Sequence, residues 1–236
     1  MENFTSTSGN TAANALPAER ASFIRKTYLL LAAAILAFIV VEGFLFASGA
    51  AGMIANVIFS GGMMGWLLVL GLFMGVSFLA NRWATSETSK ATQYFGLGIF
   101  IIAEAVIFVP LLMMATYYSG DGSVLIKAGI VTLGLFLGIT ATVFITRSDF
   151  SFLGPILAIG GFAALGFIVA SALFGFTLGN IFAFVMVAFA GTAILYETSN
   201  VLHRFNTNQH VAASLTLFAS IALLFWYILS IFSSRD

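Results

Sequence analysis

Residues 178–200 read LGNIFAFVMVAFAGTAILYETSN, an uncharged apolar run followed by a short segment that contains an acid. The run from Leu178 to Leu195 is long enough to cross a bilayer, because a helix of about 20 apolar residues spans about 30 Å of hydrocarbon. Glu197 lies near the end of this run. Acids in hydrocarbon are costly, and they usually face a protein interior or a water-filled path. The segment therefore predicts a membrane-spanning helix and makes Glu197 the first candidate for a functional side chain.

Apolar runs of this kind recur along the whole chain. Hydrophobic residues make up 61% of the sequence and charged residues 8%, whereas roughly a quarter of the residues are charged in soluble domains. Strict alternation of apolar and polar residues is absent, and the runs are too long for barrel strands. The sequence predicts an all-α polytopic membrane protein, a bundle of seven transmembrane helices. The expected spans are residues 27–48, 63–81, 92–117, 124–146, 152–174, 178–202 and 210–232.

The segments outside these spans are short. Residues 1–20 are rich in Ser, Thr, Asn and Ala and lack an apolar core, so we expect a disordered cytoplasmic tail before a single seven-helix domain at residues 21–236. The uncharged loop at residues 48–62 is expected to dip into the membrane interface. The absence of cysteine excludes disulfides, thiolate metal sites and cysteine nucleophiles. The formal net charge of zero suggests no nucleic-acid partner.

The basic residues predict the orientation in the membrane. With seven spans, the N-terminus and the second, fourth and sixth loops lie on one side. Seven of the nine Lys and Arg residues fall on that side: Arg20, Arg25, Lys26, Arg82, Lys90, Arg147 and Arg204. The other side holds Lys127 and Arg235. Because basic loops stay in the cytoplasm, we expect a cytoplasmic N-terminus and an external C-terminus. The expected location is a bacterial inner membrane, with the endoplasmic reticulum or Golgi as the alternative for a eukaryotic source.

Three acids lie within the expected spans. Glu42 is close to the external end of its helix, so we expect it to reach the lipid headgroups. Glu104 sits near mid-membrane, six residues before Pro110, which frees the carbonyl of Val106 from its helical bond. Glu104 either lines an ion path or is protonated and bonded to a neighbouring helix. Glu197, which water can reach from the cytoplasmic side, is the expected pH sensor and the candidate metal ligand.

Small and polar residues predict how the helices pack. Gly71 and Gly75 form a G-x-x-x-G pattern, which often marks a close helix–helix contact. In the sixth span, small residues recur at helical spacing on the side that carries Glu197. In the seventh, Thr216 and Ser220 belong to the most polar stripe. We expect the acidic side and the polar stripe to meet inside the bundle.

Other charged residues suggest weaker roles. Arg82 and Arg204 lie at the same membrane face as Glu197, where they are either its charge partners or anchors of the positive-inside kind. His203 and His210 flank the sixth loop and are expected to face solvent. No histidine is deep enough to serve as a base, and no hydrolase or phosphate-loop motif occurs. We therefore expect no enzymatic activity and no tightly bound cofactor.

Three short segments, taken together, resemble the transmembrane Bax inhibitor motif family, also called Bax inhibitor-1-like. Residues 146–151, TRSDFS, are similar to that family's T-K-x-D-F-S turn, and Asp149 is the acid of this turn. Residues 195–200, LYETSN, resemble its Y-D-T motif in the sixth span. Glu104 between two alanines, with Pro110 following, resembles the pattern of the third span. The resemblance runs from about Arg20 to the C-terminus.

The resemblance implies a calcium-leak channel or a cation-transporting fold. Family members share a buried pair of aspartates in the sixth and seventh spans, and the shared proton makes this pair a pH-sensitive latch. These positions correspond to Glu197 and Ser220 here, and a serine cannot share a proton as a carboxylate does. The expected function is a pH-sensitive leak of Ca²⁺ or another cation, gated by protonation of Glu197, with Glu104 and Ser220 in the path. The alternatives are a non-conducting regulator that binds proteases or stress factors, and a proton-coupled transporter with Glu104 and Glu197 as its relay.

Overall fold

A computed structural model describes residues 11–85, 89–120 and 122–234, the side chains of residues 118 and 119 excepted. This part of the chain is helical throughout, apart from loops and one isolated bridge. Seven of the helices are long and apolar enough to cross a membrane, which confirms the predicted fold class. The helices are α1 (Pro17–Ala47), α2 (Ala50–Ser60), α3 (Gly62–Ala84), α4 (Lys90–Ser119), α5 (Ser123–Thr146), α6 (Leu153–Phe174), α7 (Gly179–His203) and α8 (His210–Ser233).

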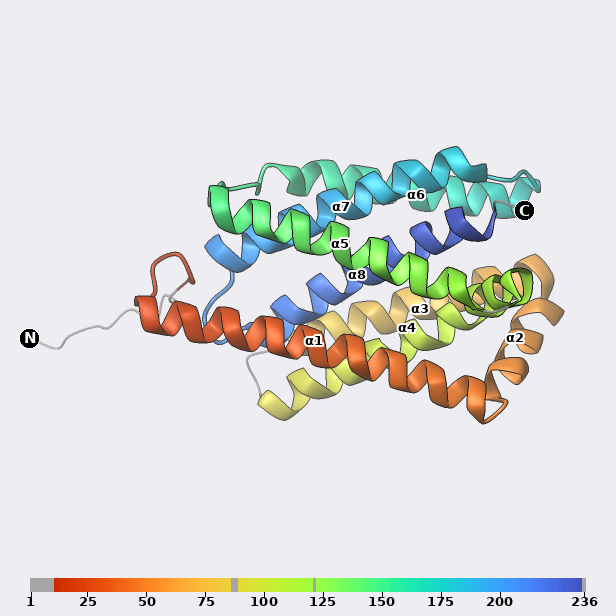
Figure 1. Ribbon diagram of the computed structural model, residues 1–236, viewed down its shortest axis with the longest axis horizontal. Coiled ribbons are helices and arrows are strands. Elements are labelled where there is room, and N and C mark those ends of the chain that lie inside the picture. The colour runs from red at the N-terminus through yellow and green to blue at the C-terminus, as the bar shows by residue number, and fades with distance from the viewer. Residues whose placement is uncertain (1–10, 86–88, 121, 235–236) are drawn as a thin grey trace, which may run out of the picture.

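Helix α8 lies at the centre of the bundle. It packs against α1, α3, α4, α5 and α7, and Figure 1 shows it between α5 and α7 on one side and α3 and α4 on the other. Its apolar residues surround the whole helix, and such a helix is buried rather than amphipathic. Leu217, Leu224 and Leu229 are inaccessible from outside. Helix α6 is also apolar all round, but it packs mainly on α7 and forms the edge of the bundle.

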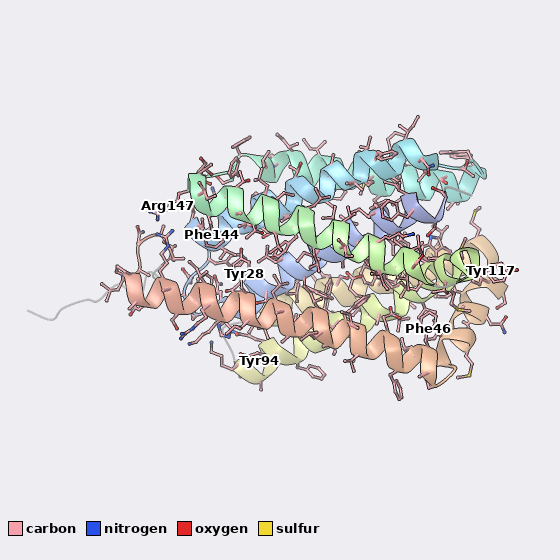
Figure 2. The ribbon with its side chains drawn as sticks, in the orientation of Figure 1. Tyr28, Phe46, Tyr94, Tyr117, Phe144 and Arg147 are labelled. Atoms are coloured by element: carbon pink, nitrogen blue, oxygen red, sulfur yellow. The ribbon has the colours of Figure 1, made fainter. Side chains whose placement is uncertain are left out.

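The two ends of the bundle differ in charge. We call the end that carries Arg20, Arg25, Lys26, Arg82, Lys90, Arg147 and Arg204 the basic end. Figure 2 shows nitrogen-bearing side chains gathered there near Tyr94 and Arg147, whereas Phe46 and Tyr117 lie at the opposite end. The predicted distribution of basic residues along the helices is therefore present in three dimensions. Arg235 lies outside the described residues.

The segment predicted as a loop at residues 48–62 contains a helix, α2. Gly49 and Gly62 have positive φ angles of 80° and 54°, so the chain turns sharply on either side of α2. Ala51 and Ala55 are buried in a small cluster with Val109 of α4. The segment thus forms part of the bundle, because its alanines pack against α4.

The N-terminal boundary also differs from the expectation. Helix α1 begins at Pro17, where the fixed φ of proline suits the first helical turn. Before it, Thr11 forms a bridge with Asn206, and the backbone N–H of Ala12 donates to the Phe205 carbonyl over 2.8 Å. Thr11 and Ala12 therefore lie against the loop between α7 and α8. Residues 1–10 lie outside the described residues, and for them a disordered tail stays a prediction.

The close helix contact predicted at Gly71 and Gly75 is not formed there. A Cβ atom built on either glycine would have no atom within 4 Å, because both face outward from the bundle. The close approach is instead at Gly96 of α4, where a Cβ would lie 2.8 Å from the Ala80 carbonyl oxygen of α3. Helices α3 and α4 therefore touch near the basic end, through Gly96 and two buried alanines, Ala80 and Ala84.

Candidate functional site

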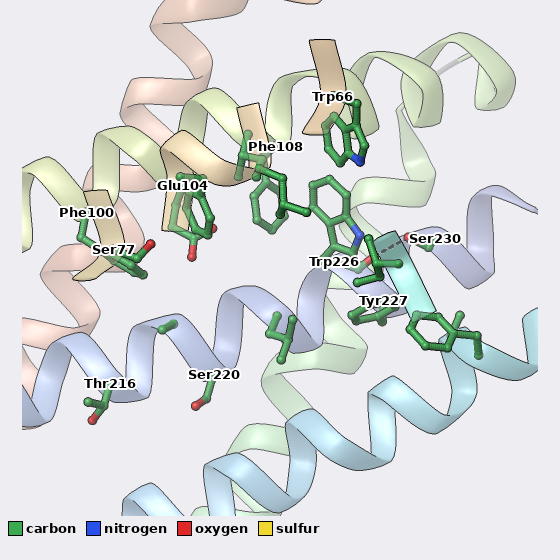
Figure 3. Close-up of a pocket in the computed structure, with 18 of the residues that line it drawn as sticks. Trp66, Ser77, Phe100, Glu104, Phe108, Thr216, Ser220, Trp226, Tyr227 and Ser230 are labelled. Atoms are coloured by element: carbon green, nitrogen blue, oxygen red, sulfur yellow. Dashed lines mark hydrogen bonds between the residues drawn. The ribbon is translucent and has the colours of Figure 1, made fainter. Parts of the chain in front are cut away.

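A cavity of about 700 Å³, partly open to the outside, lies between the helices and is lined by residues of α3, α4, α6, α7 and α8. Glu104 of α4, Glu197 of α7 and Ser220 of α8 all line it. These are the three residues predicted to share an ion path. The structure therefore brings together side chains that lie far apart in the sequence, and the cavity is the candidate functional site (Figure 3).

Glu104 enters the cavity without a partner. Glu104 is 7% exposed and lies on the inner face of α4, next to Ala105, which is fully buried. Within the described part of the chain, no hydrogen bond or ion pair is formed with its carboxyl group. Figure 3 shows Glu104 pointing into the space between α4 and α8. An acid held in this way needs a proton, water or a cation as its partner.

Glu197 has polar neighbours on two helices. The side-chain amide of Asn200 donates to its Oε2 atom over 3.4 Å. Thr216 of α8, whose hydroxyl donates to the Ala213 carbonyl over 3.2 Å, lies near the Glu197 carboxyl group. Ser220 follows Thr216 by one helical turn and is 9% exposed. The acidic side of α7 and the polar stripe of α8 thus meet, as predicted. Ser220 contributes a hydroxyl to the cavity, while the second carboxyl comes from Glu104 on another helix.

The turn between α5 and α6 docks on the end of α7 that carries Glu197. The backbone N–H of Phe150 donates to the Ser199 hydroxyl over 2.9 Å. Four residues after Phe150, Gly154 lies so close to Tyr196 that a Cβ atom on Gly154 would be 3.1 Å from the Tyr196 hydroxyl oxygen. Two of the three segments that carry the family resemblance are therefore in direct contact, and the turn fixes the position of α7 next to Glu197.

Asp149 stabilises this turn rather than lining the cavity. Its Oδ1 atom accepts the backbone N–H of Ser151 over 2.9 Å. That bond, with help from the charges of His203 and Arg204, holds the pKa of the Asp149 carboxyl below its usual range. Arg204 thus acts on Asp149. Neither Arg204 nor Arg82 lines the cavity, and the pairing of either with Glu197 stays a prediction.

Two titratable residues lie in other environments than expected. Glu42 is 7% exposed, and both of its carboxylate oxygens are buried without a partner in the described structure. It continues the inner face of α1 that includes Thr27, Leu31 and Ala34, so it faces the bundle instead of the headgroups. Likewise, His210 is 8% exposed, and its Nε2 atom lies 3.0 Å from the Tyr94 hydroxyl.

The described residues form no metal centre of the usual kind. Among the described residues, no group of three or more His, Cys, Asp or Glu side chains could hold a metal ion. Tight Ca²⁺ sites use about 6–8 oxygen ligands, several of them carboxylates. Glu197, the candidate metal ligand, has Asn200 and Thr216 as its polar neighbours.

Aromatic side chains form much of the cavity wall, and the sequence reasoning missed them. Trp66 and Trp226 are stacked with ring centroids 6.4 Å apart, and Phe108 meets Trp226 edge-on at 5.0 Å. Helical spacing could have revealed part of this wall. Trp66, Phe73 and Ser77 follow one face of α3, and all line the cavity.

The fold and the cavity define an integral membrane protein of the all-α polytopic class, with two acids that line one cavity. A family model described as inhibitor of apoptosis-promoting Bax1 matches residues 20–236. The chain belongs to this family, the Bax inhibitor-1-like membrane proteins.

Relatives occur in bacteria and eukaryotes. An uncharacterized protein of Pseudomonas aeruginosa is 31% identical over 163 residues, covering 68% of each chain. The Modulator of FtsH protease YccA of Escherichia coli is 33% identical over 176 residues, covering 73% of this chain and 77% of the relative. Bax inhibitor 1 of Schizosaccharomyces pombe is 27% identical over 219 residues, covering 90% of this chain and 76% of the relative.

Proposed function

We propose that this protein is a pH-sensitive leak pathway for cations, with Ca²⁺ as the candidate ion, and that the path runs through the acid-lined cavity. The observation that carries the proposal is that Glu104 and Glu197, from two different helices, line one cavity. Acids inside membrane bundles generally mark ion or proton paths. Membership of the Bax inhibitor-1-like family supports the same reading.

The two carboxyl groups provide the pH dependence. Together they hold zero, one or two protons, and each proton lost adds a negative charge to the cavity. The negatively charged forms attract cations, whereas the doubly protonated form does not. Ser220 cannot titrate, so Glu104 takes the place of a second acid on α8. Because few carboxylates are present, Ca²⁺ is held weakly, and weak holding suits passage better than storage.

The basic end faces the cytoplasm in this proposal, and the membrane is the bacterial inner membrane. Seven basic side chains at one end satisfy the positive-inside rule. A relative in another Escherichia coli strain is named inner membrane protein YccA and shares 33% identity over 176 residues. Cysteine-scanning with a membrane-impermeant thiol reagent in intact cells tests this orientation. Labelling in the α7–α8 loop from outside would contradict it.

The leak is tested by uptake of radioactive Ca²⁺ into liposomes that hold the purified protein, at pH values from about 6 to about 8. We expect uptake above that of empty liposomes and a pH response that is clearly weakened in Glu197→Gln, because, among the described residues, only Glu104 then remains in the cavity to gain or lose a proton. Glu42→Gln is the matched control. Glu42 is as buried as Glu104, at 7% exposed, but does not line the cavity. An unchanged pH response in Glu197→Gln would contradict the proposal.

The second candidate is a non-conducting regulator of a membrane protease. The observation in its favour is the 33% identity to a protein named modulator of FtsH protease. The replacement of an acidic pair on α7 and α8 by Glu197 and Ser220 also suits a member without ion flux. The two candidates differ in whether the purified protein alone moves cations. Absence of flux, together with a changed rate of substrate degradation by a membrane protease, would favour the regulator.

A further inference from the structure

The cavity has a second property that an inorganic ion would not use, namely its apolar aromatic wall. Phe100, Glu104 and Phe108 follow each other at intervals of four residues on one face of α4, and all three line the cavity. The carboxyl group of Glu104 is therefore flanked by an aromatic ring on each side along the helix. Figure 3 shows Phe108 between Glu104 and Trp226, at the same side of the cavity.

The described ionisable side chains that line the cavity include acids but no bases. Glu104 and Glu197 are its acids, and no Lys, Arg or His is among the residues that line it in the described structure. Glu104 is buried, aimed into the space and without a hydrogen bond or ion pair there. A buried carboxylate without a partner is costly, so the ionised form of Glu104 favours an occupant that brings a positive charge.

We infer that the cavity is a binding site for a lipophilic organic cation. Its charged centre lies beside Glu104, between the rings of Phe100 and Phe108, and its apolar groups contact Trp66 and Trp226. Aromatic faces attract cations, most strongly where water is excluded. The volume of about 700 Å³ falls within the range of about 300–1,000 Å³ that is usual for small-molecule sites. The inference rests on the proposed function in one respect, that a cation occupies this cavity.

Other occupants fit the wall less well. A lipid acyl chain would cover the aromatic rings but leave Glu104 buried and unpaired. A bare Ca²⁺ ion would pair with the carboxyl groups, but it would lack most of its oxygen ligands and leave the aromatic wall unused. An organic cation uses both features.

The test compares two ions of matched shape and opposite charge, tetraphenylphosphonium and tetraphenylborate. Binding of each to the full-length protein in detergent is measured by equilibrium dialysis and by quenching of tryptophan fluorescence, since Trp66 and Trp226 line the cavity. We expect saturable binding of tetraphenylphosphonium and at least about tenfold weaker binding of tetraphenylborate. We also expect Glu104→Gln to weaken binding of the cation by about tenfold or more, and Glu104→Asp and Glu42→Gln to retain it.

Equal binding of the two ions would overturn the inference, because the cavity would then select for apolar surface alone. Unchanged affinity in a folded Glu104→Gln protein would overturn it as well. Ca²⁺ uptake assays separate this result from the leak. Cation binding without Ca²⁺ flux supports the site and refutes the leak, whereas flux without cation binding refutes the site and supports the leak. If both hold, tetraphenylphosphonium blocks the flux.

Discussion

Gly96→Ala forces apart two helices that frame the cavity, and the structure allows its effect to be worked out. A Cβ atom on Gly96 of α4 would lie 2.8 Å from the Ala80 carbonyl oxygen and 3.0 Å from the Trp83 Cβ atom, both on α3. Ordinary contacts between heavy atoms lie at about 3.5–4.0 Å. The nearest neighbour belongs to the backbone and cannot rotate away. Helices α3 and α4 must therefore separate by roughly half an ångström or more.

Overpacking of this kind costs about 1–3 kcal/mol in free energy of unfolding. Alanine also gains up to about 1 kcal/mol over glycine through helix propensity, which masks part of the loss. Gly75→Ala on α3 is the matched control, because a Cβ there would have no atom within 4 Å. The propensity gain is common to both variants. Gly96→Ala should therefore be less stable than Gly75→Ala by about 1–3 kcal/mol.

The assay is reversible unfolding in mixed detergent micelles, followed by the fluorescence of the three tryptophans. Both variants are compared with the wild-type protein at several denaturant concentrations, so that a change in slope is not mistaken for a change in stability. Equal stability of the two alanine variants would refute the close approach of α3 and α4 at Gly96.

Three other predictions concern the ends of the cavity and the turn beside it. Ser199→Ala removes the hydroxyl that accepts the Phe150 N–H and should lower the free energy of unfolding by about 1 kcal/mol. Thr192→Ala is the control and should change the free energy of unfolding little, because the Thr192 hydroxyl donates to the Ala188 carbonyl of its own helix. Ionised Asp149 has a lowered folded-state pKa, so it stabilises the fold above the ordinary carboxyl pKa of about 3.9, and this contribution is lost as the pH falls through the lowered value. Melting temperatures measured across this acid range should fall less steeply in Asp149→Asn than in the wild type, and parallel curves would contradict the role given to Asp149. Trp226→Ala removes a side chain shared by the cavity of about 700 Å³ and a second cavity of about 300 Å³, and liposome assays should show a larger cation leak. A smaller or unchanged leak would show that the Trp226 side chain does not block the ion path between the two cavities.

The spans themselves could be predicted from sequence because each is decided locally, by length and apolar composition. The seven predicted runs correspond to the seven long helices. Helix α2 was missed because its Ala- and Gly-rich sequence resembles a loop, and its stability comes from packing of Ala51 and Ala55 on α4. Tertiary contact, not local propensity, makes this segment helical.

Which side of a helix faces inward was harder to predict. Lipid and protein interior are both apolar, so hydrophobicity does not distinguish them. Gly71 and Gly75 therefore looked like a helix contact but face outward, and Glu42 looked interfacial but faces inward. Polar residues carried more information. Thr216 and Ser220 correctly indicated the side of α8 that meets Glu197.

The position of Glu104 relative to Glu197 could not be derived from sequence, since it depends on how α4 and α7 pack around α8. Pro110 and the mid-membrane depth marked Glu104 as unusual but said nothing about its neighbours. The structure supplies that relation by placing both acids on one cavity. The aromatic wall could not be derived from sequence either, because its side chains come from four different helices, α3, α4, α7 and α8.

The shared cavity is tested most directly by a double-mutant cycle on cation flux. Radioactive Ca²⁺ uptake is measured in liposomes for the wild type, Glu104→Gln, Glu197→Gln and the double variant, with Glu42→Gln as control. If both acids act on one path, the single variants each reduce uptake, and the double variant reduces it by less than the product of the two single effects. If the double variant reduces uptake by the full product of the two single effects, Glu104 and Glu197 act independently. Wild-type uptake no higher than that of empty liposomes would contradict the leak itself.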